Sequence, residues 1–407
     1  MAAMTCAMLA PAAPALGAAG DLDPSFGGDG VVVTNLTPGN DAANAVAIQA
    51  DGKVVVAGRT TGGGGQVVVA RYTAAGLLDP TFSGDGIART NLSHGNDEAT
   101  GLAIQPDGKI VVAATAGTPG TNSLFAVLRY DPDGRLDRSF SRDGRVAAAV
   151  PGGGVARAVS LQADGRIVVA GSADAHSIEF AVVRFRPDGA VDTSFGGDGT
   201  VVTTLTGSFD FGEAVAVQPN GRVIVAGFAG AGRYGLVRYT AAGALDTTFS
   251  GNGKAVLPVG GFASAIALHG GKIVLAGGVP LDRMGVVRVN ADGTLDRTFG
   301  RRGVARTAFP GFTTTSAAAV AIQPDGKIVA AGFASSFRGR GDFALARYTA
   351  VGALDPTFGG DGRVHTAFPP GGRDSAAGVA LQPDGRIVAV GRAAGHGGRL
   401  ALARYLG

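Results

Sequence analysis

The sequence repeats itself seven times, and this recurrence restricts the possible folds more than any other feature. Three short patterns follow one another in fixed order, at a period of 50 to 59 residues. They are a Leu/Val-Asp-x-x-Phe turn, a Gly followed by Lys or Arg and then Val or Ile, and an Arg before an aromatic residue (Val in one copy). A period of this length predicts a repeat architecture in which neighbouring copies bury a shared core.

The positions of these patterns define the copies. The turn contributes Asp23, Asp79, Asp137, Asp192, Asp246, Asp296 and Asp355. The glycine of the second pattern is Gly52, Gly108, Gly165, Gly221, Gly271, Gly326 and Gly385. The arginine of the third is Arg71, Arg129, Arg184, Arg238, Arg288, Arg347 and Arg404.

Each copy predicts four short strands. In the first copy they are residues 30–36, 44–49, 53–58 and 67–72, and the strands of all copies are rich in Val and Ile and bounded by Gly, Asp, Asn or Pro. Six copies place Asp-Gly or Asn-Gly between the second and third strands, as in Asp51-Gly52, and the fifth copy has Gly270-Gly271. Asp-Gly and Asn-Gly favour a type I′ hairpin, which needs positive φ at both central residues. We therefore expect a tight hairpin of this type in every copy.

Four antiparallel strands per repeat are typical of a propeller blade. We predict an all-β fold: a seven-bladed β-propeller with four antiparallel strands per blade. Residues 18–23 match the turn at residues 74–79, whereas the last copy stops just before the equivalent turn. The N-terminal strand, residues 30–36, should therefore complete the sheet formed by residues 377–405 and close the ring.

The turn and the Gln-Pro-Asp-Gly-Lys-Ile-Val-Val-Ala hairpin at Gln105 to Ala113 resemble the delta-60 repeat family, a bacterial β-propeller-like repeat of unknown function. Gln323 to Gly332 shows the same pattern. The resemblance extends from about residue 21 to residue 407, although the fifth copy lacks the Gln-x-Asp segment. It implies an exported or surface protein and brings no established catalytic residues.

The composition of the chain argues against two classes of function, nucleic-acid binding and membrane spanning. The net charge is only +3 and is spread along the chain, so we expect no nucleic-acid partner. No apolar run beyond the first twenty residues is long enough for a transmembrane segment. Residues 1–20 are apolar and small, with Ala15-Leu16-Gly17 as a possible cleavage pattern, although this stretch lacks the basic region of a signal peptide. We expect a leader at 1–20, a single domain at 21–407, and a secreted or cell-surface monomer.

The recurring Arg and Asp predict an ion pair in every copy. Each Arg precedes the Asp of the next turn by eight residues, and Arg404 would meet Asp23 across the closure. A charge at an apolar strand end needs a partner, so we expect bidentate pairs at these positions. The alternative is that seven Arg or Asp line a pore. The Phe of the same turn is expected to fill the gap between neighbouring blades.

Catalytic and metal-binding motifs are scarce. Asp131 to Asp137 comes nearest to a calcium loop but lacks the closing Glu. The glycine run at residues 62–65 precedes no helix that could bind phosphate. The histidines, His94, His176, His269, His365 and His396, fall at unrelated offsets in different copies. We expect no catalytic, cofactor-binding or metal-binding residue, with a divalent cation such as calcium as the weaker alternative.

The loops that differ between copies locate the expected ligand surface. With the second strand of each copy innermost, the loops after the first and third strands emerge on one ring face, and the uniform turns emerge on the other. Variable loops on a uniform scaffold favour binding. The possible ligand-face residues are Asp41, Asp97, Glu98, Arg233, Arg283, Arg338, Arg340 and Asp374. Solvated loop charges are the plainer interpretation of most of them.

We thus predict a noncatalytic binding module whose ligand is a protein or a glycan. Two alternatives stay open. One is a propeller hydrolase or lyase with a site in the central channel. The other is a purely architectural repeat protein.

Overall fold

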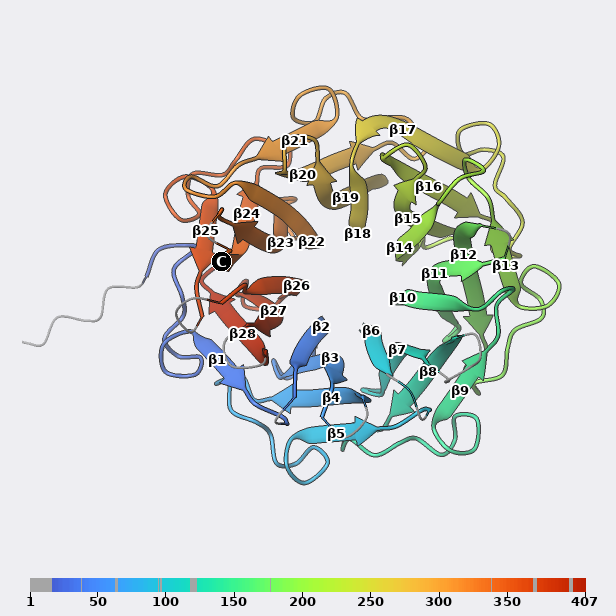
Figure 1. Cartoon of the computed structure of the whole chain (residues 1–407), viewed down its shortest axis with the longest axis horizontal. Helices are drawn as coiled ribbons and strands as arrows, with labels where there is room; N and C mark the ends of the chain where they lie inside the picture. The colour runs from blue at the N-terminus through green and yellow to red at the C-terminus, as the bar shows by residue number, and fades with distance from the viewer. Residues whose placement is uncertain are drawn as a thin grey trace, which may run out of the picture.

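The chain forms a closed ring of seven four-stranded antiparallel sheets around a central channel (Figure 1). The computed structural model describes residues 17–407 except 38, 63–64, 94, 96, 118–122, 176, 338, 369–371 and 395–397. The predicted seven-bladed β-propeller is confirmed. Among the residues that are described, no helix is long and apolar enough to cross a membrane.

Every blade has the same strand order from the channel outward. The innermost strands are β2 (Asp41–Ile48), β6 (Glu98–Ile104), β10 (Gly154–Leu161), β14 (Phe211–Val217), β18 (Phe262–His269), β22 (Thr314–Ile322) and β26 (Ser375–Leu381). The second strands are β3 (Val54–Thr60), β7 (Ile110–Ala116), β11 (Ile167–Asp174), β15 (Val223–Ala229), β19 (Lys272–Val279), β23 (Ile328–Ser335) and β27 (Ile387–Ala393).

The third strands are β4 (Gln66–Tyr72), β8 (Leu124–Tyr130), β12 (Ile178–Phe185), β16 (Arg233–Tyr239), β20 (Arg283–Val289), β24 (Gly341–Tyr348) and β28 (Arg399–Tyr405). The outermost strands are β5 (Ile87–Thr90), β9 (Arg145–Ala148), β13 (Thr200–Thr203), β17 (Lys254–Gly260), β21 (Val304–Thr307), β25 (Arg363–Thr366) and β1 (Val31–Thr34). We number the blades 1 to 7 from β2–β5 to β26–β28, the last completed by β1.

The ring closes as the sequence predicts, through the first strand of the chain. β1 pairs antiparallel with β28, with Val31 opposite Ala403 and Val32 opposite Leu402. The observed strand is shorter than the predicted 30–36. Because β1 supplies the outer edge of blade 7, the two ends of the chain share one hydrogen-bonded sheet.

The hydrophobic core lies between blades. In the cluster between blades 7 and 1, Val54 and Val56 of β3 pack with Val388 and Val390 of β27, and all four are buried. The Tyr72 hydroxyl is 2.7 Å from the Thr34 hydroxyl of the neighbouring blade. Each sheet is therefore apolar on both faces and depends on its neighbours to exclude water.

The predicted type I′ hairpin is wrong in six copies. In the first copy, Gly52 has a φ of 81° but Asp51 does not have a positive φ. The Gly52 amide donates to the Gln49 carbonyl, which is the pattern of a three-residue loop with a type I turn and a terminal left-handed residue. Only the fifth copy has both residues in the left-handed region, Gly270 at 55° and Gly271 at 73°. One left-handed glycine is enough once the loop contains three residues.

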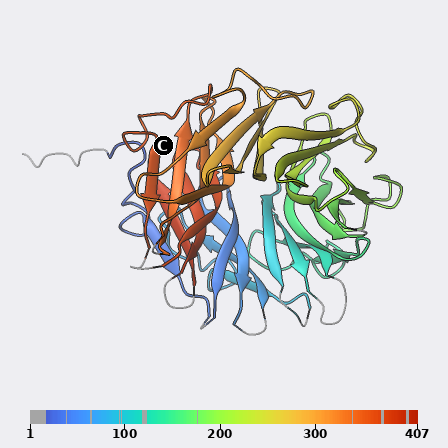
Figure 2. The same cartoon turned by 45° about the horizontal axis from the view of Figure 1, so that its top comes forward.

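The strands run from one side of the ring to the other, so connections gather on two faces (Figure 2). We call the turn face the one formed by the hairpins between innermost and second strands, together with the turns that lead to the outermost strands. We call the loop face the opposite one, where second strands connect to third strands and each blade connects to the next.

Candidate functional site

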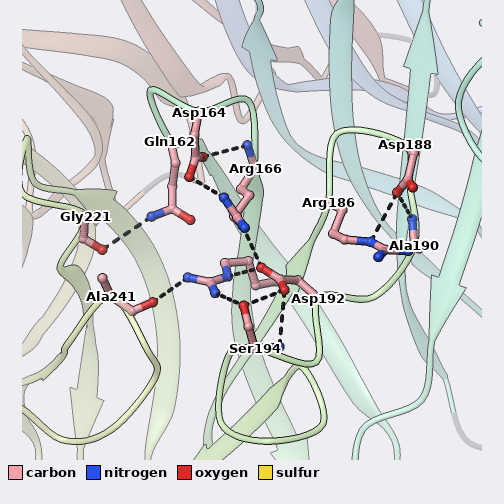
Figure 3. Close-up of polar contacts among 11 residues, drawn as sticks. Gln162, Asp164, Arg166, Arg186, Asp188, Ala190, Asp192, Ser194, Gly221 and Ala241 are labelled. Atoms are coloured by element: carbon pink, nitrogen blue, oxygen red, sulfur yellow. Dashed lines mark hydrogen bonds and ion pairs between the residues drawn. The ribbon is translucent and has the colours of Figure 1, made fainter.

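Every blade carries the same ion-pair cluster on the turn face, which we call the clamp. In the clamp of blade 3, drawn in Figure 3, Asp192 Oδ2 accepts hydrogen bonds from Arg184 Nε at 2.8 Å and from Arg166 Nε at 2.7 Å. The Ser194 hydroxyl donates to Asp192 Oδ1 at 2.7 Å and accepts from Arg184 Nη2 at 3.0 Å. Arg184 and Asp192 are buried. The three recurring sequence patterns thus converge on one carboxylate.

The clamp also joins neighbouring blades. Arg184 Nη1 donates to the Ala241 carbonyl in the next blade at 2.5 Å. The Phe195 ring lies under the same guanidinium, 4.7 Å from ring centroid to Cζ. Gly243 of the next blade contacts that ring so closely that a Cβ there would lie 3.1 Å from it. The predicted position of the Phe between blades is confirmed.

The predicted Arg–Asp pairs are present in all seven blades, with Nε to Oδ2 distances of 2.6 to 2.9 Å. The pairs are not bidentate, however. Only Nε reaches the carboxylate, because Nη2 binds a Ser or Thr hydroxyl, and in six clamps Nη1 binds a carbonyl of the next blade. Burial at the blade junctions also removes these residues from the pore, so the alternative of an Arg or Asp ring lining the channel is wrong.

A second cation, which was not predicted to belong to this ion pair, completes each clamp. It is the Lys or Arg that follows the hairpin glycine. Its distance to the clamp Asp is 3.4 Å for Lys53, 2.7 Å for Lys109 and 2.8 Å for Arg222. The equivalent residues in the other blades are Arg166, Lys272, Lys327 and Arg386.

These contacts hold the clamp carboxyls ionised. Burial alone would raise the pKa of Asp79, but hydrogen bonds from Thr81 and the charges of Arg71 and Lys53 outweigh it and lower that pKa to about 2. The same balance lowers the pKa of Asp192 and Asp355 to about 2. The pKa values of the remaining clamp aspartates, Asp23, Asp137, Asp246 and Asp296, are also lowered.

The channel is lined by one β-bulge from every blade. In each innermost strand the pairing register shifts by one residue, which leaves an extra residue at the same level of the ring. These residues line a cavity of about 230 Å³ and are Asn44, Thr100, Arg157, Glu213, Ser264, Ala318 and Ala377.

Two of these residues form the one ion pair among the channel-lining residues that the structure describes. Arg157 Nε of blade 3 lies 3.5 Å from Glu213 Oε2 of blade 4. Burial raises the pKa of Glu213, and the charge of Arg157 opposes that rise only in part. The channel therefore presents one cation and one carboxyl among small side chains. Within the described chain no three His, Cys, Asp or Glu side chains are grouped as a metal ion would require.

Arg157 and Glu213 were not predicted as site residues, although the sequence contains a signal for them. All seven innermost strands contain one variable residue between two small ones, as in Ala43-Asn44-Ala45 and Ala156-Arg157-Ala158. Small neighbours allow the backbone to bulge. The residue between them changes from copy to copy, whereas its neighbours are always Ala or Gly. This difference indicates a position whose side chain the fold does not constrain.

Three of the predicted ligand-face residues are buried beneath the loop face. Asp41, Asp97 and Asp374 are 0%, 1% and 2% exposed. Asp41 Oδ2 accepts hydrogen bonds from the amides of Leu36 and Thr37 at 2.7 and 3.1 Å, and Asp97 and Asp374 bind the amides of their own loops in the same manner. The plainer interpretation of these residues as solvated charges is wrong, since each carboxylate holds a loop in shape.

The predicted arginines occupy the loop face at the blade tips. Arg233 and Arg283 are exposed at the first positions of β16 and β20, and Arg340 is exposed in the loop before β24. Arg338 lies outside the described residues. The structure thus brings three of these cations to one face, over blades 4 to 6.

Glu98 lies at the start of the innermost strand of blade 2. Its Oε1 accepts a hydrogen bond from Asn44 Nδ2 at 2.9 Å, and its Oε2 lies 3.6 Å from Arg59 Nη1. Asn44 is the bulge residue of blade 1. Glu98 and Arg59 are partly exposed, so this polar group joins the channel lining to the loop face.

Comparisons with known proteins agree with the architecture. Six segments match a family described as "Domain of unknown function (DUF5122) beta-propeller": residues 49–82, 105–140, 162–195, 218–249, 271–299 and 323–358. Five of the segments run from a position just before the hairpin glycine, and one from that glycine itself, to the Phe of the next turn. The seventh equivalent is divided between the two ends of the chain. No curated protein matches the chain.

Two solved structures share the fold. One is a catalytically inactive variant of virginiamycin B lyase from Staphylococcus aureus with quinupristin: 12% identity, 92% of this chain and 98% of that chain covered, TM-score 0.51. The other is an ulvan lyase of a new polysaccharide lyase family: 13% identity, 92% and 96% covered, TM-score 0.53. At this identity the likeness concerns the fold alone.

Removing the buried arginine of a clamp should destabilise the ring strongly. In Arg184→Met, Asp192 keeps Arg166 but loses its buried partner and the bond to blade 4, so the free energy of unfolding should fall by about 3 kcal/mol. The matched variant Arg166→Met removes a partly exposed cation and should cost about 1 kcal/mol or less. Because the chain has no tryptophan, urea denaturation followed by far-UV circular dichroism measures the free energy of unfolding of both variants. Equal costs would contradict the dominant role of the buried arginine.

The clamps should make the ring sensitive to acid. A carboxyl whose pKa is lower in the folded state stabilises the fold above its unfolded pKa, and this contribution is lost as pH falls through the folded pKa. The urea midpoint should therefore stay constant down to about pH 4 and fall steeply toward about pH 2. In Asp79→Asn the accompanying loss in the free energy of unfolding should be smaller by about 2 kcal/mol, because one titrating group is gone. An identical pH profile in the variant would count against this explanation.

Proposed function

Because the chain is a β-propeller repeat protein, we propose that it is an exported or cell-surface module that binds a protein or glycan through its loop face without catalysis. We further propose that its repeat is the delta-60 repeat. Two matched segments, 105–140 and 323–358, begin at the Gln of the hairpin pattern on which that resemblance rests. Export is supported by the small apolar stretch at residues 1–20.

The observation that supports the proposal most is that the recurring charged residues are paired on the turn face, whereas the loop face has exposed arginines that differ between blades. On the turn face the clamps engage the recurring Arg, Lys and Asp with one another and with backbone carbonyls. On the loop face, Arg233, Arg283 and Arg340 are exposed and occur in only some blades. Groups that differ between copies and reach solvent are the ones available to a ligand.

The mouth of the channel offers the best-defined polar group for such a ligand. Glu98 and Arg59 present a carboxylate and a guanidinium next to the Asn44 amide. Together they can accept and donate hydrogen bonds to hydroxyl or amide groups of a glycan or a peptide. Glu98 is also the one acidic ligand-face candidate whose side chain is not buried.

A channel enzyme, hydrolase or lyase, is the alternative, and one observation favours it. Burial raises the pKa of Glu213, as expected of a general acid, and Arg157 beside it could bind an anionic substrate group. The bulge positions of the other blades carry no further ionisable side chain, so this pair would act without a second acid or base.

A glycan array probed with the intact labelled protein tests the proposal. We expect selective binding, weakened about 10-fold or more by Glu98→Gln with Arg59→Gln, because the variant loses the charges of the channel-mouth group. Arg135→Gln, an exposed arginine on the turn face, should leave affinity unchanged.

The same glycans are then analysed by mass spectrometry for cleavage. Absence of binding to glycans and to immobilised extracellular proteins would overturn the binding proposal. Cleavage that disappears in Glu213→Gln would replace it with the enzyme.

A further inference from the structure

Four large apolar side chains protrude from the loop face over blades 4 to 6, the upper half of the ring in Figure 1. They are Phe209, Phe262, Leu281 and Phe337. Leu281 and Phe337 are 82% and 94% exposed. Each comes from a different connection or strand end, and Phe209 and Phe262 are 60% and 40% exposed. Exposed apolar side chains gathered on one surface indicate an interaction with a partner or a membrane.

Leu281 is placed against its backbone preference. It occupies the turn between β19 and β20 with a φ of 72°, a region that favours glycine over a branched side chain. The equivalent turn of blade 4 has Gly230-Ala231-Gly232, so the fold does not require leucine there. A large apolar residue that is both strained and solvent-exposed gives no stability to the ring, which points to a function outside it.

Positive charge accompanies these apolar tips. Arg233, Arg283, Arg340 and Arg373 are exposed on the same part of the loop face. Of the acidic residues there, Asp210 is buried against its own loop and Asp342 binds His365 at 2.8 Å, whereas Asp282 is exposed. The surface is therefore cationic, and its partner should be anionic.

We propose that this surface docks onto an anionic lipid bilayer. Apolar tips on separate loops of three neighbouring blades can all enter a flat interface at once, while the arginines meet lipid phosphates. An acidic polypeptide is less suited as the partner, because it would have to extend across all of these separate loops to contact the same side chains. Because the tips lie to one side of the ring axis, the docked ring is tilted, and the loops of blades 1 to 3 stay open to solvent. This inference goes beyond the proposed function and does not depend on it.

Vesicle flotation with the full chain tests the proposal. The probes are phosphatidylcholine vesicles with and without phosphatidylglycerol, at low and high salt. We expect binding to the anionic vesicles at least about 10-fold tighter than to neutral ones, weakened by salt. The variant Phe209→Ser, Leu281→Gly, Phe337→Ser should lose about 10-fold or more, although Leu281→Gly relieves backbone strain and preserves the fold.

Two further sets of variants test the contribution of the arginines and the location of the binding surface. Replacing Arg233, Arg283 and Arg340 by Gln should weaken binding about 5-fold per residue at low salt. The matched control Leu77→Ser with Val351→Ser removes exposed apolar residues of the turn face and should leave vesicle binding unchanged.

Three outcomes would overturn the proposal. The first is binding of equal strength to anionic and neutral vesicles, or no binding to either. The second is a loss of vesicle binding in the turn-face control as large as in the loop-face variant. The third is binding to soluble poly-L-glutamate that is as tight as binding to the anionic vesicles. The last result would assign the surface to an acidic polypeptide.

Discussion

In every blade, the contact between one buried aspartate and two cations fixes how that blade is oriented against the next one. Hydrophobic burial between blades supplies most of the favourable free energy, but it is not directional and would tolerate sliding of one sheet on the next. The clamp adds contacts that depend on geometry and so fix the position of each sheet relative to the next. A guanidinium such as that of Arg184 binds a carboxylate and a hydroxyl of its own blade, a carbonyl of the next blade and the face of Phe195. Burying that charge without all these partners would be strongly unfavourable.

This constraint explains which residues recur and which vary. The three recurring patterns of the sequence supply the parts of the clamp, so a change in any one of them would leave a buried charge incompletely paired. The bulge residues and the loop tips make no contribution to the clamp. They differ from blade to blade, from Ala318 to Arg157 in the channel and from Ala231 to Leu281 at the tips. The repeat fixes one face of the ring, and the other face can specialise.

Much of this architecture could be predicted because it depends on local sequence and recurrence. The match between residues 18–23 and 74–79 was enough to place β1 beside β28. The sequence motif Asp51-Gly52 located a hairpin but not its type, since the extra loop residue depends on how the flanking strands pair. The Arg–Asp spacing predicted the pairs but not how the guanidinium is shared among three acceptors, because one of them, the carbonyl of the next blade, is set by the packing of neighbouring blades. Asp41 was placed on the correct face, yet its burial depends on how its own loop folds back over it.

The coupling free energy between the two buried partners of a clamp tests the central claim most directly. A double-mutant cycle with Arg238→Met, Asp246→Leu and the double variant measures it in blade 4, where Nε and Oδ2 are 2.8 Å apart. If the clamp acts as described, the two substitutions should be strongly non-additive, with a coupling of about 2–3 kcal/mol. A coupling below about 0.5 kcal/mol would mean that the arginine and the aspartate stabilise the ring independently, and would contradict the account.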